Sequence, residues 1–458
     1  MKKSTIDLSR RQLLNRFGGV LLGSSAFYAT SARFQLANAS LPVFDDYKAL
    51  VCVFLFGGND AFNMLVPAGQ SEYEAYQASR QTLSIPRADL LAINPANSQG
   101  MQWGLHPSMA GVQSLFAQQK LALVANVGAL VEPVTKAAYQ NNSVRLPPQL
   151  FSHNDQQTFN QSLQSGTQRT GWAGRAAELM SSANSNQKLS MNISVSGSNI
   201  WQTGEQLVPY SVNPAGVKEL ENLNANSDEA RERARTQVYQ ALLAQQQPNV
   251  FQRQFARTQQ LAWELAGEVK GALDAQPPLT TVFPASQLGN GLKMVAQLIS
   301  ARAALGVKRQ VFFVGMGDFD THGDQLRRHV LLLSQLSQGL QAFYSATQEL
   351  GVANQVTTFT ASDFGRTLTS NGDGTDHGWG SHQLVMGGAV KGGDIYGTLP
   401  SLSLGGSQDV GQGRIIPGIS MDEYAATLAS WYGLPGSHFG DVFPNLANFT
   451  NLDLGFLY

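Results

Sequence analysis

Seven side chains that could bind a metal ion lie in short glycine-rich segments between residues 318 and 382. Three of the chain's seven histidines belong to this set, which comprises Asp318, Asp320, His322, Asp363, Asp376, His377 and His382. Neutral imidazoles and short carboxylates are the ligands that proteins offer to divalent metals such as zinc or manganese. Their types and spacing predict a metal-assisted hydrolase.

The segment Asp320-Thr321-His322 places two potential ligands in one tight turn. A solvated loop with a capping aspartate would explain one carboxylate, but not a carboxylate beside a histidine. We therefore predict Asp320 and His322 as metal ligands. Asp318, four residues before His322, remains a candidate for a second-shell or substrate contact.

The second such turn begins at Asp376-His377-Gly378 and ends at His382. Its glycines allow the backbone to fold closely around a bound ion or anion. We predict His377 as a metal ligand. Asp376 and His382 stay open between ligation, support of another ligand and contact with a substrate.

The motif Ser362-Asp363-Phe364-Gly365-Arg366 carries a carboxylate with a guanidinium three residues later. We predict Asp363 as a metal ligand and Arg366 as a catalytic residue that orients it or binds an anionic ester oxygen. A structural salt bridge at the start of a helix is the alternative.

Further candidates come from earlier in the chain. Asp60 follows an unbroken apolar run and a Gly-Gly pair, and we predict it as a metal ligand, with Asn59 as a substrate contact. A turn-forming Asn-Asp pair would also explain both. Ser152 is the candidate nucleophile because amide dipoles at a helix start favour its anion, although serines there also serve as simple caps. His153, beside it, is a candidate for support of a metal ligand or for contact with a substrate.

The elements that must position these residues read as an α/β protein. Apolar or β-branched runs predict strands, and three- and four-residue apolar spacing predicts helices. Alternation of the two predicts a largely parallel sheet with helices on both faces, and ligands at the carboxyl ends of its strands. The predicted strands cover residues 50–56, 121–127, 189–195, 310–314 and 355–360, and the long helices cover 229–247, 249–275 and 325–350. Residues 181–290 are expected to be an insertion rich in helix.

The first 39 residues have the pattern of a twin-arginine signal peptide. Arg10-Arg11 precede a mildly apolar stretch, and Ala37-Asn38-Ala39 is a cleavage site, so the mature chain would start at Ser40. An uncleaved membrane anchor is the alternative. We expect export through the twin-arginine translocase to the periplasm or beyond.

The mature chain would carry 25 basic against 31 acidic side chains, a net charge of about −6. Such a balance offers no basic stripe for nucleic acid. Residues 40–458 contain no apolar run of about 18 residues, so no membrane span is expected there. Cys52, the only cysteine, allows no internal disulfide.

Several ordered motifs together resemble the exported bacterial family known as domain of unknown function 1501. The resemblance covers nearly the whole mature chain and is carried by residues 53–60, 151–153, 170–175, 320–322, 362–366, 376–378 and 387–393. It implies the fold of the alkaline phosphatase and sulfatase superfamily, with one or two zinc, manganese or calcium ions. The order of ligands and nucleophile in that superfamily is matched by Asp60, Ser152, Asp318 or Asp320 with His322, Asp363 and His377.

Two departures from the superfamily pattern affect what the resemblance implies. The Cys- or Ser-x-Pro-x-Arg motif of sulfatases is absent, and Phe364 stands where a histidine follows the aspartate. The hypothesis is an exported metal-dependent hydrolase of phosphate or sulfate esters, small or polymer-linked. The alternatives are a non-catalytic accessory protein associated with carbohydrate or another polymer, and a structural surface protein.

Overall fold

The structure, a computed structural model, describes residues 44–458 except 99, 167–168, 218–222 and 246–247. The predicted signal peptide, residues 1–39, lies outside the described residues. Within the described part, no helix is long and apolar enough to cross a membrane.

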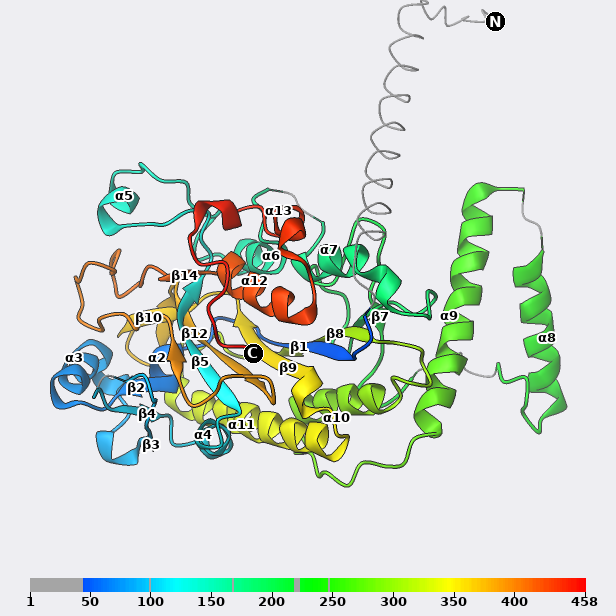
Figure 1. The fold of residues 1–458 in the computed structure, drawn as a ribbon, viewed down its shortest axis with the longest axis horizontal. Helices are drawn as coiled ribbons and strands as arrows, with labels where there is room; N and C mark the ends of the chain where they lie inside the picture. The colour runs from blue at the N-terminus through cyan, green and yellow to red at the C-terminus, as the bar shows by residue number, and fades with distance from the viewer. Residues whose placement is uncertain (1–43, 99, 167–168, 218–222, 246–247) are drawn as a thin grey trace, which may run out of the picture.

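A mixed, mostly parallel sheet of nine strands forms the centre of the molecule (Figure 1). Its order is β13-β5-β12-β9-β1-β8-β6-β7, with β14 also paired to β5. Among the described residues, the strand pairs in this sheet are parallel except the two made by β12. The predicted fold class is thus confirmed. The strands are β1 (Lys48–Leu55), β5 (Leu121–Gly128), β6 (Asn192–Ser194), β7 (Tyr210–Ser211), β8 (Arg309–Met316), β9 (Val356–Ser362), β12 (Ser381–Gly387), β13 (Ile395–Tyr396) and β14 (Ile419–Ser420).

Helices cover both faces of this sheet, as expected. In Figure 1, α4, α10 and α11 lie below it, and α6, α7, α12 and α13 lie above it. Because alternate residues of a strand point to opposite faces, β1 contributes Val51 and Val53 to the lower core and Cys52 and Phe54 to the upper one. These helices are α4 (Ala110–Ala117), α6 (His153–Ser162), α7 (Trp172–Leu179), α10 (Gln287–Ser300), α11 (Gln325–Glu349), α12 (Met421–Tyr432) and α13 (Phe439–Val442).

The segment expected to be a helical insertion contributes to two parts of the structure. Two long helices, α8 (Ala230–Ala244) and α9 (Val250–Asp274), form the expected hairpin, which stands at one end of the molecule (Figure 1). Within the same residues 181–290, however, β6 and β7 extend the central sheet beyond β8. The C-terminal half of α9 also packs into the core through Leu265, Val269 and Ala272.

Smaller elements surround the sheet edge at which the predicted site lies. A three-stranded sheet pairs β2 (Leu65–Pro67), β4 (Trp103–Leu105) and β3 (Leu91–Ile93), and a two-stranded sheet pairs β10 (Arg366–Ser370) with β11 (Thr375–His377). The short helices there are α2 (Ala61–Met64), α3 (Gln70–Arg80) and α5 (Lys136–Gln140).

One strand differs from the sequence expectation. The predicted turn around His382 is in fact β12, which runs antiparallel between β9 and β5. The glycines on both sides of this segment favour a turn, so the sequence pattern did not reveal a buried strand. As a consequence, β1 and β5 run in the same direction but are separated by two strands.

Candidate metal centre

The three central strands β8, β1 and β9 are parallel neighbours, so their carboxyl ends meet at one edge. The loops that follow them carry Asp320, Gly57 and Asp363. Gly57 has φ +112°, and a Cβ there would lie 2.3 Å from the backbone nitrogen of Asp320. This glycine therefore lets the loop after β1 pack directly against the loop after β8.

Three side chains at this edge bring potential ligand atoms within 4.8 Å of one another: His153, Asp320 and His377. They come from the first residue of α6, the loop after β8 and the end of β11. His322 joins them, since its Nε2 lies 3.1 Å from Asp320 Oδ1 and 2.9 Å from His377 Nε2. We call His153, Asp320, His322 and His377 the candidate metal centre.

Each imidazole of the centre is held from behind by a hydrogen bond to Nδ1. His153 Nδ1 lies 2.7 Å from Asp363 Oδ2, and His322 Nδ1 lies 3.1 Å from Asp376 Oδ1. His377 Nδ1 lies 2.7 Å from the carbonyl oxygen of Phe151. Because ionised carboxylates and carbonyls only accept, the Nδ1 atoms carry the protons and each neutral ring keeps a lone pair on Nε2. Metal-binding histidines are oriented in this way.

Asp363 supports His153 through Oδ2, and its Oδ1 atom is buried without a hydrogen-bond partner among the described residues. Its buried Oδ2 accepts from the amide of Gly57 at 3.1 Å and from Gln157 Nε2 at 2.8 Å, besides contacting His153. The hydrogen bond to Asp363 is the largest cause that raises the pKa of the His153 imidazole; the charges of Asp363 and Asp320 add to it, and burial opposes it. Asp363 was expected to be a metal ligand. In the structure it is hydrogen-bonded to His153, which is itself a candidate ligand.

Arg366 lies behind Asp320 in the same manner. Its Nη1 donates to Asp320 Oδ1 at 2.7 Å and to the carbonyl of Gly57 at 3.2 Å, while Nε and Nη2 donate to Thr375. Burial is the largest single cause and acts to raise the pKa of Asp320, but Arg366 together with His322 and His153 lowers the net pKa. The guanidinium is fully buried, so it orients Asp320 and does not present a fork to a substrate.

Asp60 and Asn59 are not brought into the centre. The buried Asp60 carboxylate pairs with Arg80 and accepts a hydrogen bond from Gln325. The Asn59 Oδ1 atom lies 3.2 Å from His329 Nε2. Both residues belong to a buried polar network beneath the sheet edge, and we leave Asp60 out of the ligand set for this reason.

Three other candidates also have partners outside the centre. The Ser152 hydroxyl, at the N-cap of α6, donates to Asp155 Oδ2 at 2.6 Å. Asp318 is exposed, and its backbone carbonyl accepts from Arg328 at 2.8 Å. His382 lies in β12, where its Nδ1 accepts the amide hydrogen of Asn126 at 3.0 Å.

Phe364 forms an apolar wall of the centre. Its ring lies 4.8 Å from the ring of His153 and 4.7 Å from that of His377, measured between centroids. Burial, the largest cause, lowers the pKa of His377, which favours its neutral form. The phenylalanine thus fills space between two imidazoles and helps to keep one of them unprotonated.

The fold and this cluster define an α/β protein with a candidate metal centre at the carboxyl ends of parallel strands. The chain belongs to the family described as "Protein of unknown function (DUF1501)", whose model matches residues 47–412. A comparison with curated proteins finds no match.

Solved structures that resemble the chain do so distantly. Ps i-CgsB in complex with k-i-k-neocarrahexaose shares 8% identity at a TM-score of 0.36, over 89% of this chain and 78% of that one. A second structure of Ps i-CgsB shares 10% identity at a TM-score of 0.35, over 88% of this chain and 77% of that one. PsFucS1 sulfatase from Pseudoalteromonas sp. shares 9% identity at a TM-score of 0.32, over 90% of this chain and 72% of that one. Similarity at this level does not transfer the chemistry of those proteins.

Proposed function

We propose that this chain is an exported metal-dependent hydrolase of phosphate or sulfate esters, with one divalent ion bound at the candidate metal centre. The observation that carries the proposal is the convergence of three imidazole Nε2 atoms on the Asp320 carboxylate, each ring fixed through Nδ1. His322 and His377 Nε2 lie 2.9 Å apart, and two lone pairs at that separation repel unless a cation or a proton lies between them.

The donor set favours some metals over others. Three imidazole nitrogens and one carboxylate match the ligands of zinc, and manganese also accepts them. Calcium takes oxygen ligands almost exclusively and fits less well. A second ion would need further ligands. The expected contributors Asp60 and Asp363 use Oδ2 on Arg80 and His153, while the Oδ1 atom of each is buried without a hydrogen-bond partner among the described residues.

The side chains around the centre have distinct roles in the proposed reaction. A bound divalent ion would supply Lewis-acid polarisation of an ester oxygen and a lowered pKa for bound water. Arg366 keeps Asp320 ionised and aimed, and Asp363 and Asp376 hold two of the imidazoles. Ser152 is the proposed nucleophile, and Asp155, which its hydroxyl contacts, would accept the proton.

We also propose the twin-arginine route of export to the periplasm or beyond. That route carries folded proteins, so a metal could be inserted before export. The supporting features are the Arg10-Arg11 pair and the Ala37-Asn38-Ala39 cleavage pattern.

The test is hydrolysis of 4-nitrophenyl phosphate and 4-nitrophenyl sulfate by chelated protein reloaded with zinc or manganese. We expect metal-dependent release of 4-nitrophenol, lost in His377→Ala and retained in the control His438→Asn, whose ring is outside the centre and hydrogen-bonded to Asp441. Metal binding without hydrolysis of either ester would favour the non-catalytic accessory protein. Absence of bound metal would contradict both the site and the reaction.

A further inference from the structure

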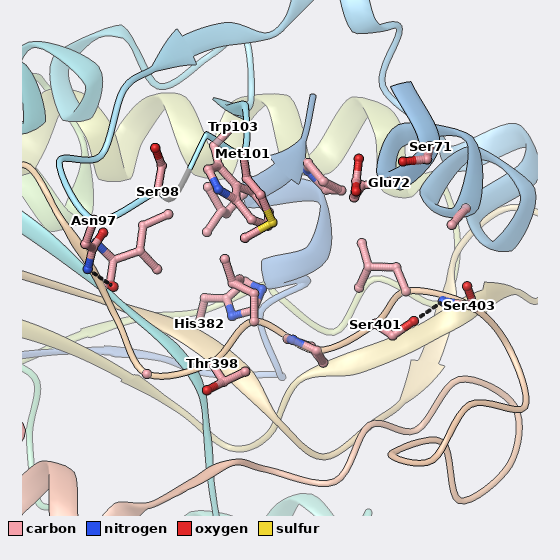
Figure 2. Close-up of a pocket in the computed structure, with 18 residues that line it drawn as sticks. Ser71, Glu72, Asn97, Ser98, Met101, Trp103, His382, Thr398, Ser401 and Ser403 are labelled. Atoms are coloured by element: carbon pink, nitrogen blue, oxygen red, sulfur yellow. Dashed lines mark hydrogen bonds between the residues drawn. The ribbon is translucent and has the colours of Figure 1, made fainter. Parts of the chain in front are cut away.

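A cavity of about 620 Å³ lies apart from the candidate metal centre. It is partly open to solvent and is lined by β2, the first half of α3, His382, residues 97, 98, 101 and 103, and the segment from Ile395 to Ser403 (Figure 2). No side chain of the candidate metal centre lines it. Its volume falls in the range of about 300–1,000 Å³ that is typical of small-molecule sites.

His382 is the buried polar side chain of this cavity, and only 2% of it is exposed. Its Nδ1 accepts the Asn126 amide hydrogen, and its ring lies edge-on to Phe62 at 5.3 Å. The neutral ring must therefore carry its proton on Nε2, which has no hydrogen-bond partner among the described residues. Burial lowers the pKa of His382 to about 4, so the ring is neutral at pH 7.

The walls combine apolar surface with small neutral polar groups. Leu65, Met101 and Trp103 supply apolar surface, and in Figure 2 the latter two lie across the cavity from His382. Hydroxyl groups come from Ser71, Ser98, Thr398 and Ser401. A ligand that satisfies both kinds of wall needs apolar faces and several hydroxyl groups.

The charges around the cavity exclude anionic ligands. Among the described residues that line it, Glu72 is the only acidic one and none is a lysine or arginine. A phosphate or sulfate group placed here would meet a carboxylate without a compensating cation. The cavity therefore suits a different kind of molecule from the ester proposed for the metal centre.

Hydrogen bonds within the protein join two walls of the cavity. The Asn97 side chain donates to the carbonyl of Ile395 at 2.7 Å and accepts from its amide at 3.3 Å (Figure 2). The amide of Asn97 also donates to Asp394 at 3.0 Å. These bonds join two walls of the cavity, so little ordering free energy is lost when a ligand enters.

We propose that this cavity binds an uncharged polyhydroxylated ligand, a short neutral saccharide, with His382 Nε2 donating a hydrogen bond to one of its oxygens. Trp103 and Met101 pack against a C–H face of the sugar, and the serine and threonine hydroxyls exchange hydrogen bonds with its edge. Since the two sites share no side chain, the inference does not depend on the proposed hydrolysis.

The test is saturation-transfer NMR on the full chain with a fixed set of neutral sugars. The probes are cellobiose and the methyl glycosides of glucose, galactose, mannose, xylose and N-acetylglucosamine, each at about 20 mM. We expect at least one to bind. Failure of all six would overturn the proposal, as would stronger binding of choline or of glucose 6-phosphate than of every neutral probe.

Two variants locate the binding. Thr398→Trp replaces an exposed wall residue with a ring that fills the cavity, and it should abolish the signal. His382→Asn keeps an acceptor for the Asn126 amide but removes the Nε2 donor, and it should weaken binding about tenfold. Undiminished binding in either variant would contradict the assignment. Both variants should bind zinc with the wild-type stoichiometry and unfold cooperatively at pH 7, which separates this result from any failure at the metal centre.

Discussion

His322 and His377 direct their Nε2 atoms at each other across 2.9 Å, although each ring already uses Nδ1 for a hydrogen bond to an acceptor. Two neutral rings cannot satisfy this arrangement alone, because neither has a second proton to donate. The pair is therefore best satisfied by a cation.

Replacing either ring should remove most of the metal affinity. We expect His322→Ala and His377→Ala to lower zinc affinity by more than about 100-fold, because each removes a direct ligand. Competition with a chromogenic chelator measures the change. Equal affinity in wild type and both variants would show that the rings share a proton rather than an ion.

Asp363→Asn should weaken the metal site indirectly. The asparagine can still accept a hydrogen bond from His153, but it lacks the charge that holds the ring. We therefore expect zinc affinity to fall by about 10- to 100-fold. The matched control is Asp318→Asn, on the same sheet edge but exposed. A larger loss in the control than in Asp363→Asn would contradict the assigned positions.

Asp60 is expected to matter for stability rather than for metal. Asp60→Asn leaves the buried Arg80 without its counter-charge, which should lower the free energy of unfolding by about 3–5 kcal/mol. Urea denaturation measures the loss, and elemental analysis should find the metal content unchanged. Loss of metal from a folded Asp60→Asn variant would restore Asp60 to the ligand set.

Acid should destabilise the chelated protein through three buried histidines. Burial, the largest cause, lowers the pKa of His106 and His382 to about 4 and that of His329 to about 3. The unfolded chain takes up these protons first, near pH 6.5, so stability is lost as the pH falls from about 6.5 towards 4.

The expected slope is up to about 1.4 kcal/mol per pH unit for each of these histidines. Urea denaturation at pH 7, 6 and 5 measures it. His382→Asn should give a shallower dependence than the wild type, since one titrating ring is removed. Identical slopes would show that His382 is not held neutral.

Gly57→Ala should disrupt the junction between two loops of the site. A Cβ at φ +112° would collide with the backbone of Phe319 and Asp320, at 2.8 and 2.3 Å. We expect a loss of at least about 1–3 kcal/mol in unfolding free energy together with weaker zinc binding. Gly267→Ala, inside α9 with open space around its Cβ, is the control; it should leave zinc binding unchanged and raise the unfolding free energy by about 0.5–1 kcal/mol. Wild-type zinc affinity in Gly57→Ala would show that this junction does not shape the site.

Much of the architecture follows from simple patterns in the sequence. The apolar run at residues 50–56 became β1, and the predicted helix 325–350 became α11 at Gln325–Glu349. Carboxylates after strands met at one edge because parallel strands end together. β12 was missed because its short run lies between glycines, and its antiparallel pairing depends on partners more than 20 residues away along the chain.

Within the site, the spacing of residues did not reveal which carboxylates face the imidazoles. Asp60 and Asp363 both follow core strands, yet one pairs with Arg80 and the other supports His153. Only the packing of α3 and α6 against the sheet edge decides this. His153 was assigned a lesser role than the geometry favours, because a single histidine at a helix start carries no spacing signal.

The position of β5 in the sheet has a consequence for how the chain folds. Among the described residues, its strand partners are β12, β13 and β14, and all of them begin at or after Ser381. β5 lies in the first third of the chain, and it stays unpaired until most of the chain has been synthesised. Such long sequence separation slows folding, and a nascent chain released early would expose an unprotected apolar edge prone to aggregation.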